Sequence, residues 1–372
     1  HHCNGVDNVE YIANLALLRG MVGKRYAGLL PLRGHSNVQG IGTMGVKPVL
    51  DEEVFRRMEQ AFGVSLPDSN GYDTLAGLEA AFRGEVDAAL IMGGNLYGAT
   101  PDAQWAEQAL DAIGFKLFLT TTLNQGHVHG VARGESLILP VTARDEEWEP
   151  TTQESMFNFV RMSDGGIKRL DDVRPETAIL CDLAARLLPA SKIDFAAFKQ
   201  HATIREAIAK TVPGMEQLAD LEAARREFHV RGRVLHSPTF KTPTGKAHFR
   251  THSLPRARTS TDYPFTLMTV RSEGQFNTII YEEADSYRNA SQRWVVFLNA
   301  QDIQALGLQE GDSVTVTSPR GSMEGLTLCA FDLPRGNAMA YFPEANVLIG
   351  RESDPRSKTP AFKSAPIAVR TC

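Results

Sequence analysis

The sequence predicts an α/β protein with a doubly wound parallel-sheet layer, followed by a β-rich module. Two short apolar segments, residues 86–92 and 115–120, flank a helix-like segment at residues 102–113. Apolar strands joined by a helix are typical of parallel sheets with helices on both faces. After about residue 263 the pattern changes to short strands, and residues 311–322 alternate apolar and polar side chains before a Pro-Arg-Gly turn. That alternation predicts a hairpin.

The composition is that of an ordinary globular protein. The chain has 372 residues, enough for two or three domains, of which 42% are hydrophobic and 22% charged. A net charge of −5 supplies no global positive field, which argues against binding to nucleic acid through the phosphate backbone. No apolar segment is long enough to cross a membrane and no signal peptide is visible, so we expect a cytoplasmic protein without a membrane span.

The four cysteines are scattered along the chain and show no C-x-x-C spacing (Cys3, Cys181, Cys329, Cys372). They therefore predict neither a disulfide framework nor a zinc site, and they do not supply the ligands of an iron–sulfur cluster.

The first quarter of the chain predicts three helices, at residues 8–20, 52–62 and 74–82. The first has apolar side chains at helical spacing, and the second follows Asp51, a good N-cap residue. Between these two helices lies the segment PLRGHSNVQGIGTMG, residues 31–45. It has neither a helical nor a strand period, so we expect an ordered loop.

The remaining elements follow from the same patterns. We expect a third parallel strand, three helices in the middle of the chain and two strands in the β-rich module, at residues 135–139, 175–188, 203–211, 217–228, 265–269 and 295–298. Changes in these patterns divide the chain into an α/β core portion at residues 1–145, a mixed connecting region at residues 146–255 and a β-rich module at residues 256–372.

The loop at residues 31–45 carries the most chemistry. It combines the guanidinium of Arg33, the imidazole of His35, the amides of Asn37 and Gln39, and four glycines. Glycines let the backbone approach a ligand, and these side chains can donate hydrogen bonds to an anion or a carbonyl group. This chemistry predicts a polar binding loop. A solvated surface turn carries about equal weight on the residues alone.

The amino-acid sequence of this loop resembles the corresponding segment of one protein family. The pattern R-G-x-x-N-V-Q-G follows a helix with N-V-x-x-I-x-N-L-A-L and precedes M-G. It resembles the molybdopterin-dependent oxidoreductases of the dimethyl sulfoxide reductase superfamily, above all their formate dehydrogenase-like alpha subunits. The resemblance implies that Arg33 lies beside molybdenum and holds an anionic substrate. Formate dehydrogenases usually have Gln at the position of His35, and from the chemistry of its imidazole we expect His35 to relay a proton. Asn37 and Gln39 would contact the cofactor.

Two polar turns at predicted strand ends extend the resemblance. MGGNLYGAT, residues 92–100, resembles the family's M-G-x-[ND]-P turn, although Leu96 replaces the proline. The resemblance implies that Asn95 reads the guanine of a pterin dinucleotide and that Gly93 and Gly94 allow close backbone approach. In the second turn, Thr120, Thr121 and Asn124 would contact ribose or phosphate, and the two threonines replace the Q-D of formate dehydrogenases.

His127 and His129 follow the second turn two residues apart, so a strand would place both on one face as a possible metal pair. No carboxylate stands nearby at metal-ligand spacing, and polar loop residues are the better interpretation. We therefore assign no residue of this chain as a metal ligand.

The β-rich module resembles the double-psi β-barrel that ends the family's catalytic subunits, which implies a molybdopterin dinucleotide-binding barrel. The residues that would contact the dinucleotide or its phosphates are Arg271, Gln275, Asn277, Asn346, Lys358 and Lys363. For Arg271 a surface ion pair is the alternative, but a cation close to Gly274 and amides suits a phosphate.

The resemblance predicts the C-terminal half of a molybdenum oxidoreductase. Its cofactor would be bis(molybdopterin guanine dinucleotide) molybdenum, with an iron–sulfur cluster and the molybdenum ligand in an N-terminal half outside this chain. We expect two-electron oxidation of a small anion, with formate as the default, an electron-accepting protein or subunit, and no activity from this chain alone. The alternative is a non-catalytic relative that is a structural subunit of a redox complex.

Overall fold

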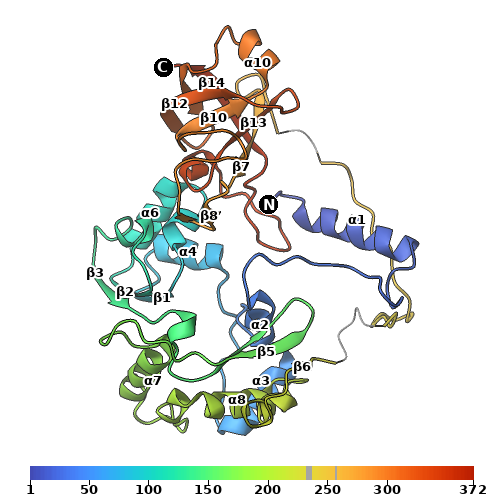
Figure 1. Ribbon diagram of the computed structural model, residues 1–372, viewed down its shortest axis with the longest axis vertical. Helices are drawn as coiled ribbons and strands as arrows, with labels where there is room; N and C mark the ends of the chain where they lie inside the picture. The colour runs from blue at the N-terminus through green and yellow to red at the C-terminus, as the bar shows by residue number, and fades with distance from the viewer. Residues whose placement is uncertain (232–236, 256–257) are drawn as a thin grey trace.

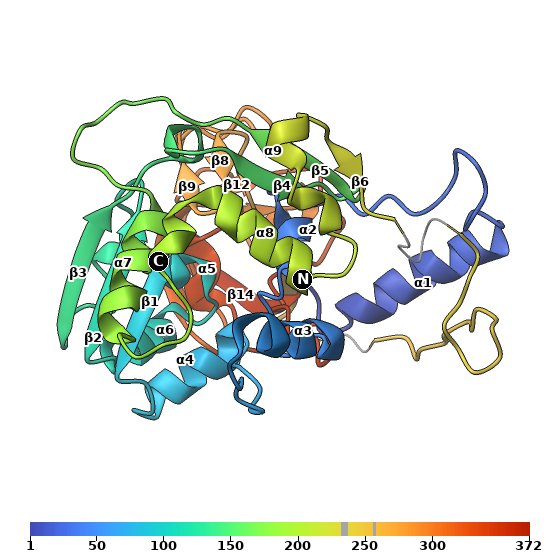
Figure 2. The same ribbon diagram turned by 90° about the horizontal axis from the view of Figure 1, so that it is seen from below.

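The computed structural model describes residues 1–231, 237–255 and 258–372 (Figure 1). A β-barrel forms one end of the molecule and a group of helices forms the other, with an α/β layer between them on one side. Helix α1 (Gly5–Leu18) lies on the opposite side from this layer. Figure 2 shows the helical end from below, with α3, α7 and α8 facing the viewer.

The α/β layer is a three-stranded parallel sheet in the order β1–β2–β3 (Ala88–Met92, Phe115–Thr120, Glu135–Pro140). Helices α4 (Thr74–Phe82) and α6 (Ala103–Asp111) share a core on one face. Helix α7 (Glu176–Leu187) packs against β2 on the other. Helices on both faces confirm the predicted doubly wound layer.

The central and edge strands of this layer differ in burial. All of β2 except Phe115 is buried, including Lys116, whose Nζ donates to the carbonyl oxygens of Leu110, Ile113 and Arg133 at 3.1, 2.8 and 3.2 Å. In the edge strand β1, by contrast, Leu90 and Met92 are about half exposed. The expectation of two covered faces is therefore right for β2 and wrong for β1.

The helical end contains α3 (Glu52–Phe62) and α8 (His201–Thr211) beside an antiparallel sheet of β4, β5 and β6 (Thr151–Glu154, Phe159–Ser163, Phe228–His229). Helix α3 has the predicted bounds, since the Asp51 carboxylate accepts the Glu53 backbone N–H at 3.1 Å. The helix predicted at residues 217–228 is wrong. The 3₁₀ turn η4 (Glu216–Leu218) and the short helix α9 (Leu221–Ala224) form there instead, and left-handed Arg225 ends α9 before β6.

Short elements connect these regions. They are α2 (Val38–Thr43), α5 (Leu96–Ala99), α10 (Ala300–Ala305), the hairpin β8–β9 (Gln275–Phe276, Ile279–Ile280) and the 3₁₀ turns η1 to η4 (Gln125–His127, Arg144–Glu146, Ala197–Lys199, Glu216–Leu218). Within the described part of the chain, no helix has the length and apolar character needed to span a bilayer.

The barrel is closed by six strands in the order β10–β12–β11–β14–β7–β13. Their bounds are Val295–Leu298, Ser322–Ala330, Ser313–Thr317, Ala365–Thr371, Phe265–Val270 and Asn337–Tyr341. Strands β11 and β12 pair antiparallel, which confirms the predicted hairpin. Inward side chains such as Leu267, Val296 and Leu328 are fully buried in one core. The double-psi crossing stays a prediction.

The barrel docks on the α/β layer through the 3₁₀ turn η6 (Glu344–Leu348). Nδ2 of Asn346 donates to the carbonyl oxygens of Gly98 and Thr100 at 2.8 and 3.2 Å. The backbone N–H of Asp102 donates in return to the carbonyl oxygens of Asn346 and Ile349. These reciprocal bonds fix the barrel against the end of α5 and the start of α6.

Helix α1 is held at its polar side. The backbone N–H of Val6 donates to Oδ2 of Asp354 at 2.9 Å, and Arg356 pairs with Glu10 at 2.8 Å. The predicted helix is therefore present. Its apolar side chains Val9 and Ile12 are 63% and 59% exposed, so its apolar face is largely open to solvent.

Candidate functional site

The segment at residues 31–45 has more regular secondary structure than the predicted loop, because it contains helix α2. Asn37 starts the helix in the left-handed region, with φ of 62°, and its Oδ1 accepts the backbone N–H of Glu154 at 3.0 Å. This asparagine conformation is tolerated where a short side chain bonds locally. The expectation of a helix-free loop is wrong, since tertiary contact with β4 outweighs the low helix propensity of glycine.

Helix α2 and strand β4 are in close contact. Thr43 Oγ1 donates to Oε2 of Glu154 at 2.6 Å, on the same strand residue whose N–H bonds to Asn37. A Cβ on Gly40 would lie 2.0 Å from Oδ1 of Asn37 and 3.2 Å from N of Glu154. Gly40 is thus required by packing. The amide oxygen of Asn37, a predicted cofactor contact, is used within the fold.

A cavity of about 630 Å³ lies between this loop and the barrel. The loop contributes Gly34 and His35, and the barrel region contributes Arg271, Asn277, Arg288 and Lys363. The ring of His35 packs edge-on against Phe276, with centroids 4.6 Å apart. No Asp or Glu is among the described residues that line the cavity. The structure therefore brings together four predicted site residues, His35, Arg271, Asn277 and Lys363, in a cationic cavity.

The three cations of this cavity are held at its wall in different ways. Arg271 Nη2 donates to Oδ1 of Asn277 at 3.0 Å, and its guanidinium lies over the ring of Phe342. The ammonium of Lys363 donates to the carbonyl oxygen of Thr269. Burial, together with the charges of Arg271 and Arg288, lowers the pKa of Lys363. The cavity thus contains positive charge that an anion would stabilise.

Arg288 was not predicted as a site residue. Its Nη1 donates to Oδ2 of Asp285 at 2.6 Å and to the carbonyl oxygen of Arg271 at 3.1 Å. Asp285 is buried and also accepts the hydroxyl of Tyr341 at 2.7 Å. Burial raises the pKa of Asp285, but bonds from Tyr341 and Arg288 outweigh it, so the carboxyl pKa is below its ordinary value. The sequence feature that could have identified Arg288 as a site residue was a cation in the loop after β9.

Two predicted contacts in the barrel have other roles in the fold. Nε2 of Gln275 donates to the carbonyl oxygens of Asn277 and Phe342 at 2.7 and 2.6 Å, and its Oε1 accepts the N–H of Ser272 at 3.1 Å. Gln275 therefore shapes the loop that presents Arg271. Lys358 is exposed on the loop beside α1 and does not line the 630 Å³ cavity.

The two predicted turns meet at the ends of β1 and β2. Gly93 and Gly94 have positive φ and open space where a Cβ would stand. Nδ2 of Asn124 donates to the carbonyl oxygen of Gly94 at 2.9 Å, which joins the turns. Asn95 is buried as the N-cap of α5, with Oδ1 accepting the N–H of Gly98 at 2.8 Å. The amide oxygen of Asn95 is thus used within the fold of this turn.

The second turn has its own internal bonds. Thr120 is buried and donates to the carbonyl oxygen of Thr122 at 2.7 Å, whereas Thr121 is exposed.

The two histidines after this turn have different neighbours. His127 Nδ1 accepts the N–H of Asn124 at 2.9 Å. His129 stacks on Tyr97 and contacts Glu107 at 3.1 Å. The two histidines therefore have separate partners and do not form the metal pair considered from their spacing.

Asn346, which joins the barrel to the α/β layer, has one polar atom left over. Its Nδ2 is bonded within the fold, but its buried Oδ1 has no hydrogen-bond partner among the described residues. Buried acceptors without partners are uncommon in folded proteins. Asn346 does not line the 630 Å³ cavity, and its contact with the dinucleotide stays a prediction.

Arg33 is exposed and lies next to the cationic cavity without lining it. With His35, Gln39 and Gln153 it lines a smaller cavity of about 190 Å³ against β4. Arg33 and Gln39 also border a cavity of about 530 Å³ toward Lys47 and Lys241. Gly34 and His35 belong to both the 190 and 630 Å³ cavities, so the loop separates the two.

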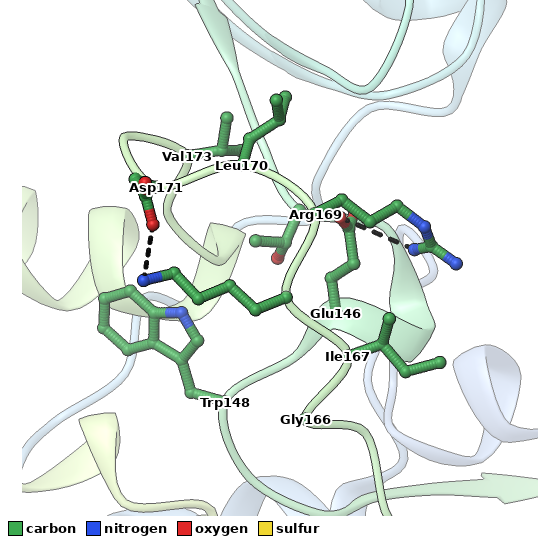
Figure 3. Close-up of a pocket in the computed structure, with 10 residues that line it drawn as sticks. Glu146, Trp148, Gly166, Ile167, Arg169, Leu170, Asp171 and Val173 are labelled. Atoms are coloured by element: carbon green, nitrogen blue, oxygen red, sulfur yellow. Dashed lines mark ion pairs between the residues drawn. The ribbon is translucent and has the colours of Figure 1, made fainter.

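Another cavity, of about 320 Å³, lies in the connection between β3 and α7 (Figure 3). Trp148 and Leu170 border it, and its cations are paired: Lys168 with Asp171 at 2.7 Å, and Arg169 with Glu146 at 3.5 Å. Because these charges offset each other, this cavity does not have the unpaired positive charge of the cavity at the barrel.

Known proteins share this architecture and sequence. The family described as Molydopterin dinucleotide binding domain matches residues 265–366. An uncharacterized oxidoreductase of Mycobacterium tuberculosis (strain ATCC 25618 / H37Rv) is 34% identical over 98% of this chain and 49% of its own length. Protein YdeP of Escherichia coli (strain K12) is 30% identical over 99% of this chain and 51% of its own. The chain spans about half the length of the curated relatives it matches.

Two further similarities are to enzymes whose names state an activity. The F420-dependent formate dehydrogenase 2 subunit alpha of Methanococcus maripaludis is 26% identical over 98% of this chain and 56% of its own. Acetylene hydratase from Pelobacter acetylenicus superimposes with a TM-score of 0.61 at 13% identity, covering 89% of this chain and 50% of the hydratase, which shows a shared fold. Residues 265–366 therefore match the molydopterin dinucleotide binding domain, and the chain is similar over nearly its whole length to oxidoreductases, a formate dehydrogenase alpha subunit among them.

Proposed function

We propose that this chain forms part of the binding site for bis(molybdopterin guanine dinucleotide) molybdenum in an oxidoreductase that oxidises a small anion by two electrons. The observation that supports this most is the 630 Å³ cavity, which Arg271, Arg288 and Lys363 line without a carboxylate among the described lining residues. A dinucleotide carries phosphates, and guanidinium groups bind phosphate oxygens through charge-assisted hydrogen bonds. The residues present therefore fit the cofactor.

The turns at the ends of β1 and β2 fit a second part of the same group. Gly93 and Gly94 leave open space above their backbone, so a flat ring or a phosphate can approach the N–H groups closely. Asn124 fixes this turn through its bond to Gly94. The unpartnered Oδ1 of Asn346 offers an acceptor to a ring N–H.

Arg33 and His35 are the residues of this chain that we propose to act on the substrate. The fork of the Arg33 guanidinium holds the substrate anion in two-point contact and offsets charge that develops during the reaction. His35 takes up or releases the substrate proton through a nitrogen of its imidazole ring. When bound, the molybdenum cofactor supplies the two-electron redox chemistry.

Formate is the default substrate, because the sequence resembles formate dehydrogenase alpha subunits and a relative carries that name. That name also describes one subunit of a larger enzyme, so we propose that the electrons pass to a partner protein or subunit. An iron–sulfur cluster in another part of the full-length protein would connect the two.

Molybdenum content tests the proposed cofactor. The full-length protein is purified and its molybdenum is measured by mass spectrometry, together with the charge-reversal variant Arg271→Glu and the control Arg370→Glu. Arg370 is an exposed cation of the same barrel that does not line the cavity. We expect near-stoichiometric metal in the parent and the control, and at least about a tenfold loss in Arg271→Glu. A metal-free parent protein would instead support a structural subunit without the cofactor.

A further inference from the structure

We propose that Asp285 is a positioning residue for anion binding in the 630 Å³ cavity. Its carboxylate holds one part of the Arg288 guanidinium, so that the remaining edge is free to bind a group with two adjacent phosphates. This inference rests on the proposed function, because it concerns how the cavity recognises the phosphates of the dinucleotide.

The ion pair between Asp285 and Arg288 extends from the cavity wall into the protein. Arg288 lines the cavity, whereas Asp285 does not. The side chain of Asp285 is fully buried and that of Arg288 is 18% exposed. Nη1 of Arg288 and Oδ2 of Asp285 lie 2.6 Å apart. A residue that supports a binding side chain in this way acts on the ligand through that side chain.

A tight turn brings the two side chains together. The backbone N–H groups of Asp285 and Ala290 donate to each other's carbonyl oxygens at 2.8 and 3.1 Å, which closes the segment between them. Asn289 in this turn lies in the left-handed region, with φ of 51°, a conformation that asparagine tolerates. The backbone therefore holds Arg288 close to Asp285 before their side chains pair.

Both oxygens of the Asp285 carboxylate accept hydrogen bonds. Oδ2 accepts Nη1 of Arg288 and the hydroxyl of Tyr341 at 2.6 and 2.7 Å. Oδ1 accepts the backbone N–H groups of Tyr287 and Glu273 at 3.1 and 3.4 Å. An amide at this position would accept through one group and donate through the other. Asparagine therefore cannot satisfy all four donors, although it has the same shape.

Arg288 has one edge left for a ligand. Its Nη1 makes both of its hydrogen bonds, to Asp285 and to the carbonyl oxygen of Arg271 at 3.1 Å. Within the part of the chain that the structure describes, Nε and Nη2 of Arg288 have no hydrogen-bond or ion-pair partner. The N–H groups of Nε and Nη2 are parallel and match two oxygens of one phosphate.

Arg271 supplies a second guanidinium in the same framework. Arg288 bonds to its carbonyl oxygen, and Nη2 of Arg271 donates to Oδ1 of Asn277 at 3.0 Å. Asp285 thus fixes Arg288 directly and Arg271 through Arg288. Two fixed guanidinium groups suit an anion with two adjacent phosphates, because each can bind one phosphate.

Inorganic pyrophosphate tests this pair without the cofactor. Its affinity for the full-length protein, purified from cells that cannot make the cofactor, is measured by isothermal titration calorimetry. We expect Asp285→Asn and Arg288→Met each to weaken binding about tenfold. Because Asp285 acts through Arg288, adding Asp285→Asn to Arg288→Met should weaken binding by less than about twofold further. Independent losses, about a hundredfold in the double variant, would overturn the inference.

Two controls separate positioning from folding. Tyr341→Phe removes another donor to Oδ2 of Asp285 but leaves the pair with Arg288. It should lower the free energy of unfolding and leave pyrophosphate affinity within about twofold of the parent. Glu324→Gln, at an exposed carboxylate of the barrel, should change neither quantity. Equal losses of affinity in Tyr341→Phe and Asp285→Asn would contradict a positioning role.

Arg288→Lys keeps the inference testable if Asp285→Asn does not fold. Lysine retains the charge that pairs with Asp285 but has no second edge for a phosphate, so pyrophosphate should bind about tenfold more weakly. Parental affinity in Arg288→Lys, or no pyrophosphate binding by the parent, would overturn the inference. Failure of the proposed function has a different signature, absence of molybdenum from the full-length protein made in cells that supply the cofactor.

Discussion

Asn346 of the barrel donates a hydrogen bond to the carbonyl oxygen of Gly98 in the α/β layer, over 2.8 Å. The same amide also reaches the carbonyl oxygen of Thr100, and both oxygens belong to the short segment that connects the end of β1 to α6. One buried side chain therefore sets the position of the barrel relative to the turn that carries Gly93 and Asn95.

Replacing Asn346 should destabilise the contact between barrel and layer. Asn346→Ala removes both hydrogen bonds and leaves buried carbonyl oxygens without a partner, so we expect a loss of about 1–3 kcal/mol in the free energy of unfolding. Urea unfolding measures it. The control Asn337→Ala also loses two bonds to backbone oxygens, but at an exposed site. It should lose less than about 0.5 kcal/mol, and equal losses would contradict the role given to Asn346.

Asn95 should affect stability as well as cofactor content. Asn95→Ala removes the N-cap of α5 and should cost about 1 kcal/mol of stability. Asn95→Asp keeps an oxygen that can accept the N–H of Gly98, and so should retain more of that stability. It replaces the Nδ2 donor with oxygen, and we therefore expect it to lower molybdenum occupancy in the full-length protein. Thermal unfolding and metal analysis are compared. Full occupancy in Asn95→Asp would count against guanine recognition by this side chain.

Arg33 should affect turnover more than folding. It is exposed at the edge of two cavities, and Arg33→Lys keeps the charge but loses the planar fork that holds an oxyanion at two points. We expect at least a tenfold loss of turnover, equivalent to about 1.4 kcal/mol of transition-state stabilisation, with unchanged molybdenum content. Dye reduction with the best small anion from a screen measures turnover. Near-normal turnover in Arg33→Ala would make Arg33 a structural residue.

His127 should make the second turn sensitive to acid. Burial lowers its pKa, and its Nδ1 accepts a backbone N–H as the neutral ring does. The unfolded state then binds more protons than the folded state below the ordinary pKa of about 6.5. Stability from this residue is present above that pH and is lost as the pH falls through the folded-state pKa. His127→Asn retains an acceptor without titrating, so its unfolding midpoint should fall less between about pH 7.5 and pH 5.

Much of the fold was predictable where pattern and cap agree. Helix α3 has an Asp51 cap and a left-handed Gly63 at its end, and strand β10 is a short apolar run; both have the predicted bounds. Helix α2 was missed because its glycines have low helix propensity, and only the contact with Glu154 explains it. Lys116 shows the same limit, since its burial depends on three carbonyl oxygens from neighbouring segments.

The site was predictable in part for similar reasons. The resemblance identified His35, Arg271, Asn277 and Lys363, and the cavity brings them together. It did not indicate that Gln275 and Asn37 use their amides within the fold, because residue type does not show which hydrogen bonds are satisfied. Arg288 was missed altogether. Its place at the cavity depends on its bond to the buried Asp285, which the sequence does not show.

The bond from Val6 to Asp354 joins residues 348 positions apart, and the cationic cavity likewise combines the loop at His35 with Lys363. During synthesis at roughly 5–20 residues per second, the first of these partners waits about 20–70 s for the second. Neither wall of the cavity holds its final position until the barrel has left the ribosome and closed. An anion held between the walls can therefore bind only once the barrel has been synthesised and closes against the loop.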